Sequence, residues 1–188
     1  MLELSLHILD ILRNSAEAGA TRVSLTLKEE LDADWLTIEV KDNGRGMTEE
    51  LAAKVLDPFV TTRTTRRVGL GLPLFAAAAR QCGGDLELHS SPGQGTRVTA
   101  RFCHSHWDRA PLGDIVATLM TILLSGATLD IDYRHRVGDR MFHLDTAEVR
   151  TELGDVPLTH PRIRDWLRNA LEEGEADLKK SGNPSGDG

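Results

Sequence analysis

The sequence lacks the features that mark secreted or membrane proteins. It contains only two cysteines, Cys82 and Cys103, which excludes a disulfide framework and predicts a cytoplasmic location. Its first residues carry no basic flank, so they do not form a secretory signal peptide. The longest apolar run, at residues 115–124, is too short to span a bilayer and contains two threonines. We therefore expect no contact with a membrane.

An excess of positive charge is also missing. The 188 residues carry a formal charge of −7 at pH 7, so most of the surface would repel a phosphate backbone. We therefore expect no nucleic-acid partner, although a local basic patch would still suit a small polyphosphate. Internal repeats and long low-complexity segments are absent. With 40% apolar and 27% charged residues, the composition is that of an ordinary globular protein.

The hydrophobic spacing predicts an α+β protein. Apolar residues at helical intervals predict helices at 4–18 and about 69–83, each ended by glycine, and we expect a short helix at 48–56 that ends before Asp57-Pro58-Phe59. Segments with one apolar face predict strands at 23–28, 36–40, 86–88 and 98–102. Helices and strands in this order predict a two-layer α/β sandwich, in which one antiparallel sheet carries its helices on one face.

The composition changes near Pro111, and we place a domain boundary there. Residues 1–108 form the first predicted domain, residues 109–180 a small α+β C-terminal extension, and residues 181–188 a tail that its composition predicts to be disordered. Within the extension we expect a helix, two strands and then a short and a long helix. The extension matches no catalytic motif. Its apolar helix and strand pair predict a surface for a partner protein or for a homodimer.

Polar residues and glycine turns follow one another in a distinctive order over residues 4–104. Asp10 and Asn14 lie four residues apart, on one face of the first predicted helix. The later motifs are Asp-Asn-Gly-Arg-Gly-Met at 42–47, Asp-Pro-Phe-Val-Thr-Thr-Arg at 57–63, Gly-Leu-Gly at 69–71 and Gly-Gln-Gly-Thr at 93–96. Each pattern is weak alone, because short glycine patterns recur by chance. Their order on the expected elements makes the combination specific.

In this order the motifs resemble those of the GHKL (Bergerat-fold) superfamily of gyrase, the large heat-shock chaperone, histidine kinases and MutL. The resemblance implies a Bergerat ATP-binding fold with ATP and Mg²⁺ as cofactors. Residues 57–63 and 69–72 are most similar to nitrogen-regulatory-type sensor kinases, whereas residues 14–22 resemble MutL. The short spacing from the Thr-Thr-Arg run to Gly69 implies a short ATP lid.

The resemblance assigns the first helix to the metal and the reaction. Asn14 would hold Mg²⁺ through its neutral amide oxygen, a ligand that this hard cation accepts. Asp10 would be the catalytic residue that orients or deprotonates the attacking group, although the family more usually has Glu at this position. A solvated aspartate and a polar residue near a helix end are the alternative interpretation of this pair.

The resemblance assigns the turn at 42–47 to the adenine base. An ionised carboxylate at Asp42 only accepts hydrogen bonds, which suits the exocyclic amine of adenine. Gly44 and Gly46 would allow positive φ angles and a close approach of the backbone to the purine. Met47 would pack against the base. An ordinary Asp-Asn-Gly turn is the alternative.

The remaining motifs would contact the phosphates and the far side of the base. Arg63, with Arg66 and Arg67, would grip the triphosphate, unless these residues belong only to a basic exposed loop. Backbone N–H groups at residues 69–71 would form an anion site at a helix start. Thr96 would reach adenine directly or through water, with a plain hairpin turn as the alternative. The predicted cofactor-binding residues are Asn14, Asp42, Gly44, Gly46, Met47, Phe59, Thr62, Arg63, Gly69, Leu70, Gly71, Leu72 and Thr96.

Two other sites are considered and rejected. The segment Cys103–His106 contains metal-binding residue types, but neighbours in a strand point to opposite faces, so Cys103 and His104 would point apart. His7 lies one turn before Asp10, yet sensor kinases carry their phosphoacceptor histidine on a separate helical hairpin. We therefore expect His7 to be a surface residue and Cys82 to be packed.

Two functions of different classes remain open. The first is a stand-alone protein kinase, similar to anti-sigma serine kinases or to the catalytic half of a split sensor kinase, which phosphorylates a partner protein. The second is a regulatory binding module, in which ATP orders the lid and changes the surface offered to a partner. A plain ATPase is the third hypothesis. The lid motifs favour the kinase.

Overall fold

The computed structural model of the protein describes residues 3–57 and 71–180. Its centre is one six-stranded sheet with the strand order β3-β4-β2-β1-β5-β6. The strands are β1 (Arg22–Glu30), β2 (Trp35–Asp42), β3 (Asp85–Ser91), β4 (Gly95–Cys103), β5 (Asp130–Val137) and β6 (Arg140–Asp145). The helices are α1 (Leu4–Glu17), α2 (Glu49–Val55), α3 (Gly71–Gln81), α4 (Ile115–Leu123), α5 (Thr146–Leu153) and α6 (Pro161–Lys179). The predicted α+β class and the Bergerat-type sandwich are confirmed.

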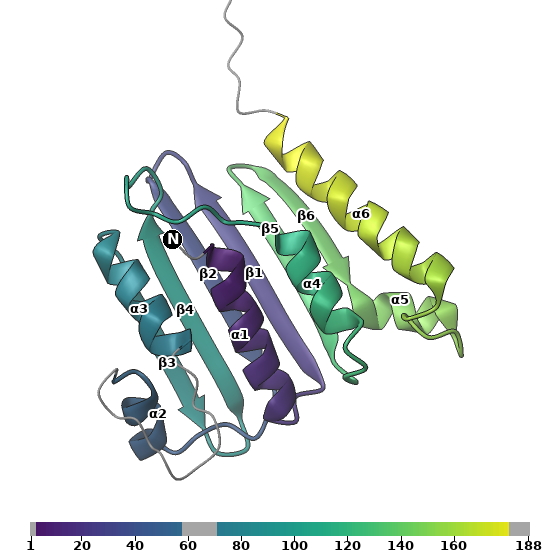
Figure 1. Ribbon diagram of the computed structural model, residues 1–188, viewed down its shortest axis with the longest axis horizontal. Coiled ribbons are helices and arrows are strands. Elements are labelled where there is room, and N and C mark those ends of the chain that lie inside the picture. Colours follow the sequence, from purple (N-terminus) through teal and green to yellow (C-terminus); the bar gives the residue numbers. More distant parts are fainter. Residues whose placement is uncertain (1–2, 58–70, 181–188) are drawn as a thin grey trace, which may run out of the picture.

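The core lies between the sheet and one layer of helices. Figure 1 shows α1, α3 and α4 side by side across one face of the sheet, with α6 beyond them over β5 and β6. The alternating apolar residues of the central strands face this layer, and Leu25 and Ile38 are completely buried. Residues on the other side of these strands are polar and partly exposed. The sequence alternation therefore determines which face of the sheet receives the helices.

The complete sheet is mixed, although the four strands of the first region pair antiparallel as expected. β1 pairs antiparallel with β2, but it pairs parallel with β5, with Val23 opposite Ile131 and Leu25 opposite Tyr133. After β4 the chain passes over the helical face through α4 before it enters β5. A helical crossover of this kind brings a strand back parallel to its neighbour. The alternation of apolar and polar residues within a strand does not indicate whether that strand pairs parallel or antiparallel with its neighbour.

The strands expected in the C-terminal extension continue the sheet of the first region. α1 also receives its first backbone contacts from this side: the N–H groups of Leu4 and Ser5 donate to the carbonyls of Pro111 and Leu112 at 3.0 and 2.8 Å. These bonds satisfy donors that a helix start leaves unpaired. The domain boundary expected between residues 108 and 109 therefore stays a prediction. None of the helices that the structure describes is long and apolar enough to cross a membrane.

A buried network of charged and polar groups joins α6 to the sheet. Tyr133 Oη donates to Glu175 Oε1 at 2.6 Å, and His135 bridges Glu175 and Glu29 through its two ring nitrogens, each at 3.0 Å. Burial alone would lower the pKa of His135, but its hydrogen bonds to Glu175 and Glu29 outweigh burial and raise the pKa to about 9. The hydrogen bond from His135 is the main reason that the pKa of Glu29 falls to about 2.

Candidate functional site

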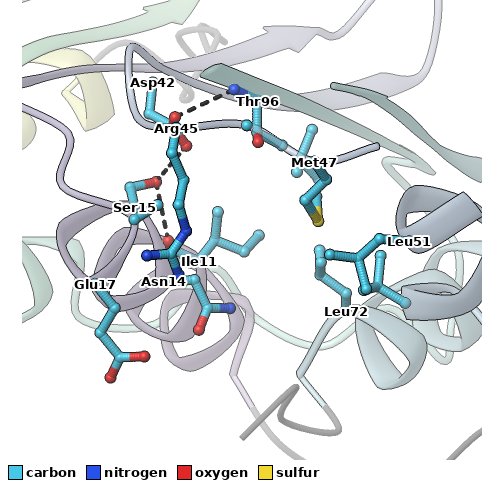
Figure 2. A pocket seen from close by; sticks show the side chains of 14 residues that line it. Ile11, Asn14, Ser15, Glu17, Asp42, Arg45, Met47, Leu51, Leu72 and Thr96 are labelled. Atoms are coloured by element: carbon cyan, nitrogen blue, oxygen red, sulfur yellow. Dashed lines mark hydrogen bonds between the residues drawn. The ribbon is translucent and has the colours of Figure 1, made fainter. Parts of the chain in front are cut away.

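A pocket of about 350 Å³ lies at the end of the sheet where β2 ends and β4 begins. Its wall contains residues of α1, of the turn after β2, of α2 and of the start of α3. Figure 2 shows polar side chains from α1 and the turn on one side of this pocket and apolar side chains on the other. Asn14 and Asp42, which the sequence analysis assigned to opposite ends of one nucleotide, both line it.

Asp42 is held in the pocket wall by three hydrogen bonds. Its Oδ1 accepts from the backbone N–H groups of Gly44 and Thr96 at 2.9 and 3.1 Å. Its Oδ2 accepts from Ser15 Oγ at 2.8 Å. The residue is only 8% exposed, and the fixed donors let it stay buried without an ion pair among the described residues. The carboxylate is thereby oriented before any ligand arrives.

Ser15 is a positioning residue that the sequence analysis missed. It follows Asn14 on α1 and is buried, and its single hydroxyl proton is shared between Asp42 Oδ2, the nearer acceptor, and the Ile11 carbonyl oxygen at 3.2 Å. Because Ser15 is 27 residues from Asp42 in sequence, only the packing of α1 against the end of β2 brings them together. No local pattern would have identified this contact.

The two glycines of the turn after β2 have different roles. Gly46 has a φ of 65°, and a Cβ added there would lie within 1.9 Å of the Ser91 carbonyl oxygen. Gly44 does not have a positive φ, which corrects the expectation for that residue. A Cβ at Gly44 would instead lie 3.0 Å from the Cβ of Ala18 on α1. Gly44 therefore lets the turn approach α1, and Gly46 lets it approach the β3–β4 hairpin.

The hairpin between β3 and β4 completes this side of the pocket. Gly95 has a φ of 79°, and an added Cβ would lie 2.0 Å from the Asp42 carbonyl oxygen. Ser90 Oγ contacts Thr96 Oγ1 at 2.9 Å and accepts from the Met47 backbone N–H at 2.8 Å. Thr96 thus belongs to a network that ties the hairpin to the turn, in addition to lining the pocket.

The opposite wall is apolar. Met47, Leu51, Val55 and Leu72 line it, from the turn, α2 and the first residues of α3. α2 is only seven residues long, and its start is stabilised because Thr48 Oγ1 accepts from the Leu51 N–H at 3.3 Å. An apolar wall opposite a buried carboxylate is suited to a heteroaromatic ring with a polar edge.

The α1 residues assigned to metal and catalysis occupy different environments. Asn14 is exposed at the pocket wall. Asp10, one turn earlier, is also exposed but is not among the residues that line the described pocket. It lies against the start of α3, where a Cβ added at Gly71 would be 3.2 Å from Asp10 Oδ2. Gly71 likewise lies beside α1 rather than in the pocket lining.

Arg45 is a further pocket residue that the sequence analysis did not select. It is the only cationic side chain among the described lining residues, and Figure 2 shows it extending from the turn toward the α1 side of the pocket. Its backbone is fixed because its N–H donates to the Ala18 carbonyl at 3.0 Å and its carbonyl accepts from the Gly93 N–H at 2.7 Å. Its position inside the Asp-Asn-Gly-Arg-Gly turn was the available signal.

Several residues assigned to the nucleotide lie outside the part of the chain that the structure describes. These residues are Phe59, Thr62, Arg63, Gly69 and Leu70, together with Arg66 and Arg67. Their assignments stay predictions. Of the assigned residues that the structure describes, Asn14, Asp42, Gly46, Met47, Leu72 and Thr96 line the pocket.

His7 is buried, which corrects the expectation of a surface histidine. Its ring stacks on Phe75 of α3 with the centroids 5.0 Å apart. Burial lowers the pKa of His7, while Asp10 and a hydrogen bond to the Gly71 backbone act in the opposite direction. The helical periodicity places His7 among the core-facing positions of α1, between Leu4 and Ile11. Cys82 is buried, as expected.

The segment Cys103–His106 forms no metal cluster with the described residues. Cys103 Sγ donates to Asp34, whereas His104 contacts Glu29, so the two side chains have different partners. The group whose geometry would suit a metal ion among the described residues is Asp132, His143 and Asp145. Both of its carboxylates already form ion pairs with arginine, Asp132 with Arg134 at 2.9 Å and Asp145 with Arg22. These arginines compete with any cation.

Comparison with known proteins identifies the family. Residues 2–106 match the model of the histidine kinase-, DNA gyrase B- and HSP90-like ATPases. The chain belongs to this family. The match ends at the loop after β4, so it contains the complete described pocket, and α4 to α6 lie beyond it.

The curated proteins that are similar to this chain include several whose names describe them as kinases. The chain is 31% identical over 119 residues to the non-motile and phage-resistance protein of Caulobacter vibrioides, which covers 58% of this chain and 14% of that protein. It is 33% identical over 104 residues to the tetrathionate sensor histidine kinase TtrS of Salmonella typhimurium, covering 53% and 17% of the two chains. It is 30% identical over 94 residues to sporulation kinase C of Bacillus subtilis, covering 50% and 22%.

The chain thus spans less than a quarter of the length of these relatives. What it shares with them is the family region with its pocket. The protein is therefore an ATP-binding, kinase-like module, and the predicted ATP cofactor is confirmed at the level of the family.

Proposed function

We propose that the protein binds Mg-ATP in this pocket and transfers the γ-phosphate to a side chain of a partner protein in the cytoplasm. The observation that carries the proposal is that Asn14 and Asp42 line one pocket although they come from different elements. A neutral oxygen ligand and a fixed carboxylate acceptor are the groups needed at the metal end and the base end of a nucleotide.

The protein side of adenine recognition follows from the contacts of Asp42. Its Oδ1 is committed to two backbone donors, whereas Oδ2 accepts from no described residue except Ser15, which leaves acceptor capacity for an amine. Met47 and Leu72 provide the apolar surface for the ring. A base that presents a carbonyl oxygen instead of an amine would meet the carboxylate unfavourably, which supports adenine over guanine.

The metal end of the pocket lies on α1. Asn14 would hold Mg²⁺ through Oδ1, and the ion would supply charge neutralisation between phosphate oxygens. Arg45, on the same side of the pocket, would contribute positive charge toward the phosphates. In this proposal the predicted lid residues Phe59, Thr62, Arg63, Gly69 and Leu70 complete the site.

Asp10 would orient the acceptor group of the partner. It is exposed beside Gly71, one turn from Asn14 on the same helix, so an incoming hydroxyl or imidazole could reach it from solvent. Its carboxylate would accept the proton of that group as the phosphoryl group is transferred.

One observation favours a regulatory binding module as the second candidate. Asp10 does not line the described pocket, and its side chain is one methylene shorter than the glutamate usual in the family. In this case ATP would order the lid and alter a partner-binding surface with little turnover.

The two candidates separate in a two-part experiment on the full chain. Calorimetry with ATP, with and without Mg²⁺, measures binding, and incubation with γ-labelled ATP and candidate partner proteins measures transfer. Label on a partner's side chain that disappears in Asp10→Asn, while ATP affinity is retained, supports the kinase. Tight binding with ATP-dependent association and no label supports the module. Phosphate release without partner labelling supports a plain ATPase, and absence of ATP binding contradicts all three.

A further inference from the structure

Two large apolar side chains are exposed at the end of the sheet opposite the pocket. Trp107, in the loop after β4, is 98% exposed, and Leu31, in the turn between β1 and β2, is 52% exposed. In Figure 1 this loop and this turn lie at the same end of the molecule, and hydrogen bonds join them. With their exposed acidic neighbours Asp32 and Asp108 these residues form what we call the hairpin-end patch.

Asp34 fastens the two segments of the patch together. Its Oδ1 accepts from the Ser105 N–H at 2.8 Å, and its Oδ2 accepts from Ser105 Oγ at 2.7 Å and from Cys103 Sγ at 3.1 Å. Its carbonyl accepts from the His104 N–H at 2.9 Å. Asp34 has a φ of 56°, an uncommon conformation that aspartate tolerates better than most residues. A strained residue with this many contacts fixes the geometry of the turn.

The loop that carries Trp107 is fixed by its own hydrogen bonds as well. Arg109 Nε donates to the His104 carbonyl at 2.6 Å, and the Arg109 N–H donates to the His106 carbonyl at 3.0 Å. The Asp108 N–H donates to His106 Nδ1 at 3.2 Å. Trp107 is therefore presented to solvent by an ordered loop, which reduces the entropy cost of burying it against a partner.

The charge around the two apolar residues is negative. Asp32 and Asp108 are exposed and form no ion pair with any residue that the structure describes, and Asp34 bonds only uncharged groups. Of the nearby cations, Lys28 is paired with Glu30 at 2.7 Å, Arg109 donates to backbone carbonyls, and the guanidinium of Arg101 lies over the Trp35 ring, 4.5 Å from its centroid. A partner that covers the patch must therefore supply positive charge as well as apolar surface.

We propose that the hairpin-end patch is a docking site for a basic protein segment in which an apolar side chain is flanked by lysine or arginine. The apolar side chain packs against Trp107 and Leu31, and the flanking cations pair with Asp32 and Asp108. Exposed tryptophans in fixed positions are frequent energetic centres of interfaces, because one ring buries 150–250 Å² at low entropy cost.

The patch is separate from the pocket. β2 begins at Trp35, beside the patch, and ends at Asp42, in the pocket wall, so roughly 23 Å of strand lies between them at the usual rise per residue. A segment docked at the patch would hold a partner protein without blocking nucleotide. Docking at the patch is thus independent of whether the pocket catalyses phosphoryl transfer.

The test uses a peptide in which two leucines are flanked on each side by two arginines, and a control peptide with glutamates in place of the arginines. Trp35→Phe combined with Trp166→Phe leaves Trp107 as the only tryptophan, and phenylalanine keeps an aromatic ring beneath Arg101. We expect a saturable shift of Trp107 emission to shorter wavelength with the basic peptide and none with the acidic one. Circular dichroism establishes that the variant is folded.

Matched variants then separate docking from general attraction to an acidic protein. By calorimetry, Trp107→Ser should weaken the basic peptide at least about tenfold, and Asp32→Asn with Asp108→Asn about three- to tenfold with a smaller salt dependence. Glu172→Gln with Glu173→Gln removes the same charge from the exposed face of α6 and should leave the affinity unchanged.

Three results would overturn the proposal. The first is no saturable emission shift with the basic peptide. The second is an equal loss of affinity in the α6 control pair, since that would indicate attraction by net charge alone. The third is a concentration-dependent emission shift of Trp107 without any peptide, which would assign the patch to a second copy of the chain.

Discussion

Asp42 is a motif residue whose side chain the structure places in the wall of the pocket. The sequence identified it because it ends an apolar strand and begins a glycine turn, and the structure places its carboxylate in the wall that also contains Asn14. Arg45 was overlooked although it stands inside the turn motif, whereas Ser15 was not identified because its importance depends on Asp42, which is distant in sequence. Residue types in a motif are therefore readable locally, but the groups that orient them are not.

Replacing Asp42 with asparagine should weaken ATP binding roughly ten- to a hundredfold, since hydrogen bonds to a charged group contribute ~1.5–3 kcal/mol. Asparagine keeps one acceptor oxygen for the backbone N–H groups of Gly44 and Thr96, but it offers an amide donor where Oδ2 was. Calorimetry with ATP measures the change. Asp155→Asn, on an exposed loop, is the charge-matched control. An unchanged affinity in Asp42→Asn would remove the adenine assignment.

The elements of this fold follow from sequence patterning, and their close contacts depend on glycine. Helices and strands were predicted with boundaries near those observed, because apolar periodicity and glycine turns mark them. The parallel pairing of β1 with β5 was not predicted, because it depends on where the crossover through α4 returns. Pairing between strands is decided by contacts between segments, not by either segment alone.

Two glycines of the β3–β4 hairpin allow the cost of a left-handed backbone conformation to be measured separately from the cost of a steric clash. Gly93 and Gly95 have φ angles of 75° and 79°, but a Cβ at Gly93 has no neighbour within 4 Å, whereas one at Gly95 would collide with the Asp42 carbonyl. Gly93→Ala should lower the free energy of unfolding by about 1 kcal/mol, the cost of the left-handed conformation. Gly95→Ala should lower it by at least about 2 kcal/mol more. Urea denaturation measures both, and equal losses would show that the turn moves freely away from Asp42.

At the scale of the whole molecule, the two regions distinguished in the sequence share one sheet. β5 covers the edge of β1, and α4 packs against α1, so removal of the later elements uncovers both. We expect a fragment of residues 1–110 to lose the cooperative thermal transition of the full chain. Differential scanning calorimetry of the two proteins makes the comparison. A fragment that unfolds cooperatively and binds ATP with the affinity of the full chain would instead support an independent first domain.

The buried network around His135 makes stability depend on pH. Since the folded-state pKa of His135 is about 9 and its ordinary value is 6.5, the network contributes stability that is fully present below pH 6.5 and is lost as the pH rises through 9. The contribution is on the order of 3 kcal/mol. For Glu29, whose pKa is lowered to about 2, stability is present above pH 4.5 and is lost as the pH falls toward 2.

Chemical denaturation of the native protein and of His135→Gln, at pH 6 and pH 10, tests this prediction. The native protein should lose more stability between these two values than the variant does, because only in the native protein does unfolding between about pH 6.5 and pH 9 release the proton that folded His135 holds. Equal losses in both proteins would show that His135 is not charged in the folded state. Arg168→Gln, which removes a positive charge from the exposed face of α6, controls for the change in net charge.

The sequence by itself determined the family, the α+β class, the helical and strand segments, and the residue types of the motifs that line the pocket. These properties are encoded over short distances, in apolar periodicity and in turns that require glycine. The tertiary structure decided that the C-terminal strands extend the sheet, that His7 is buried, that Ser15 orients Asp42, and that Asp34 ties the loop after β4 to the turn between β1 and β2. Each of these depends on contacts between segments far apart along the chain, where one residue's environment is supplied by another element.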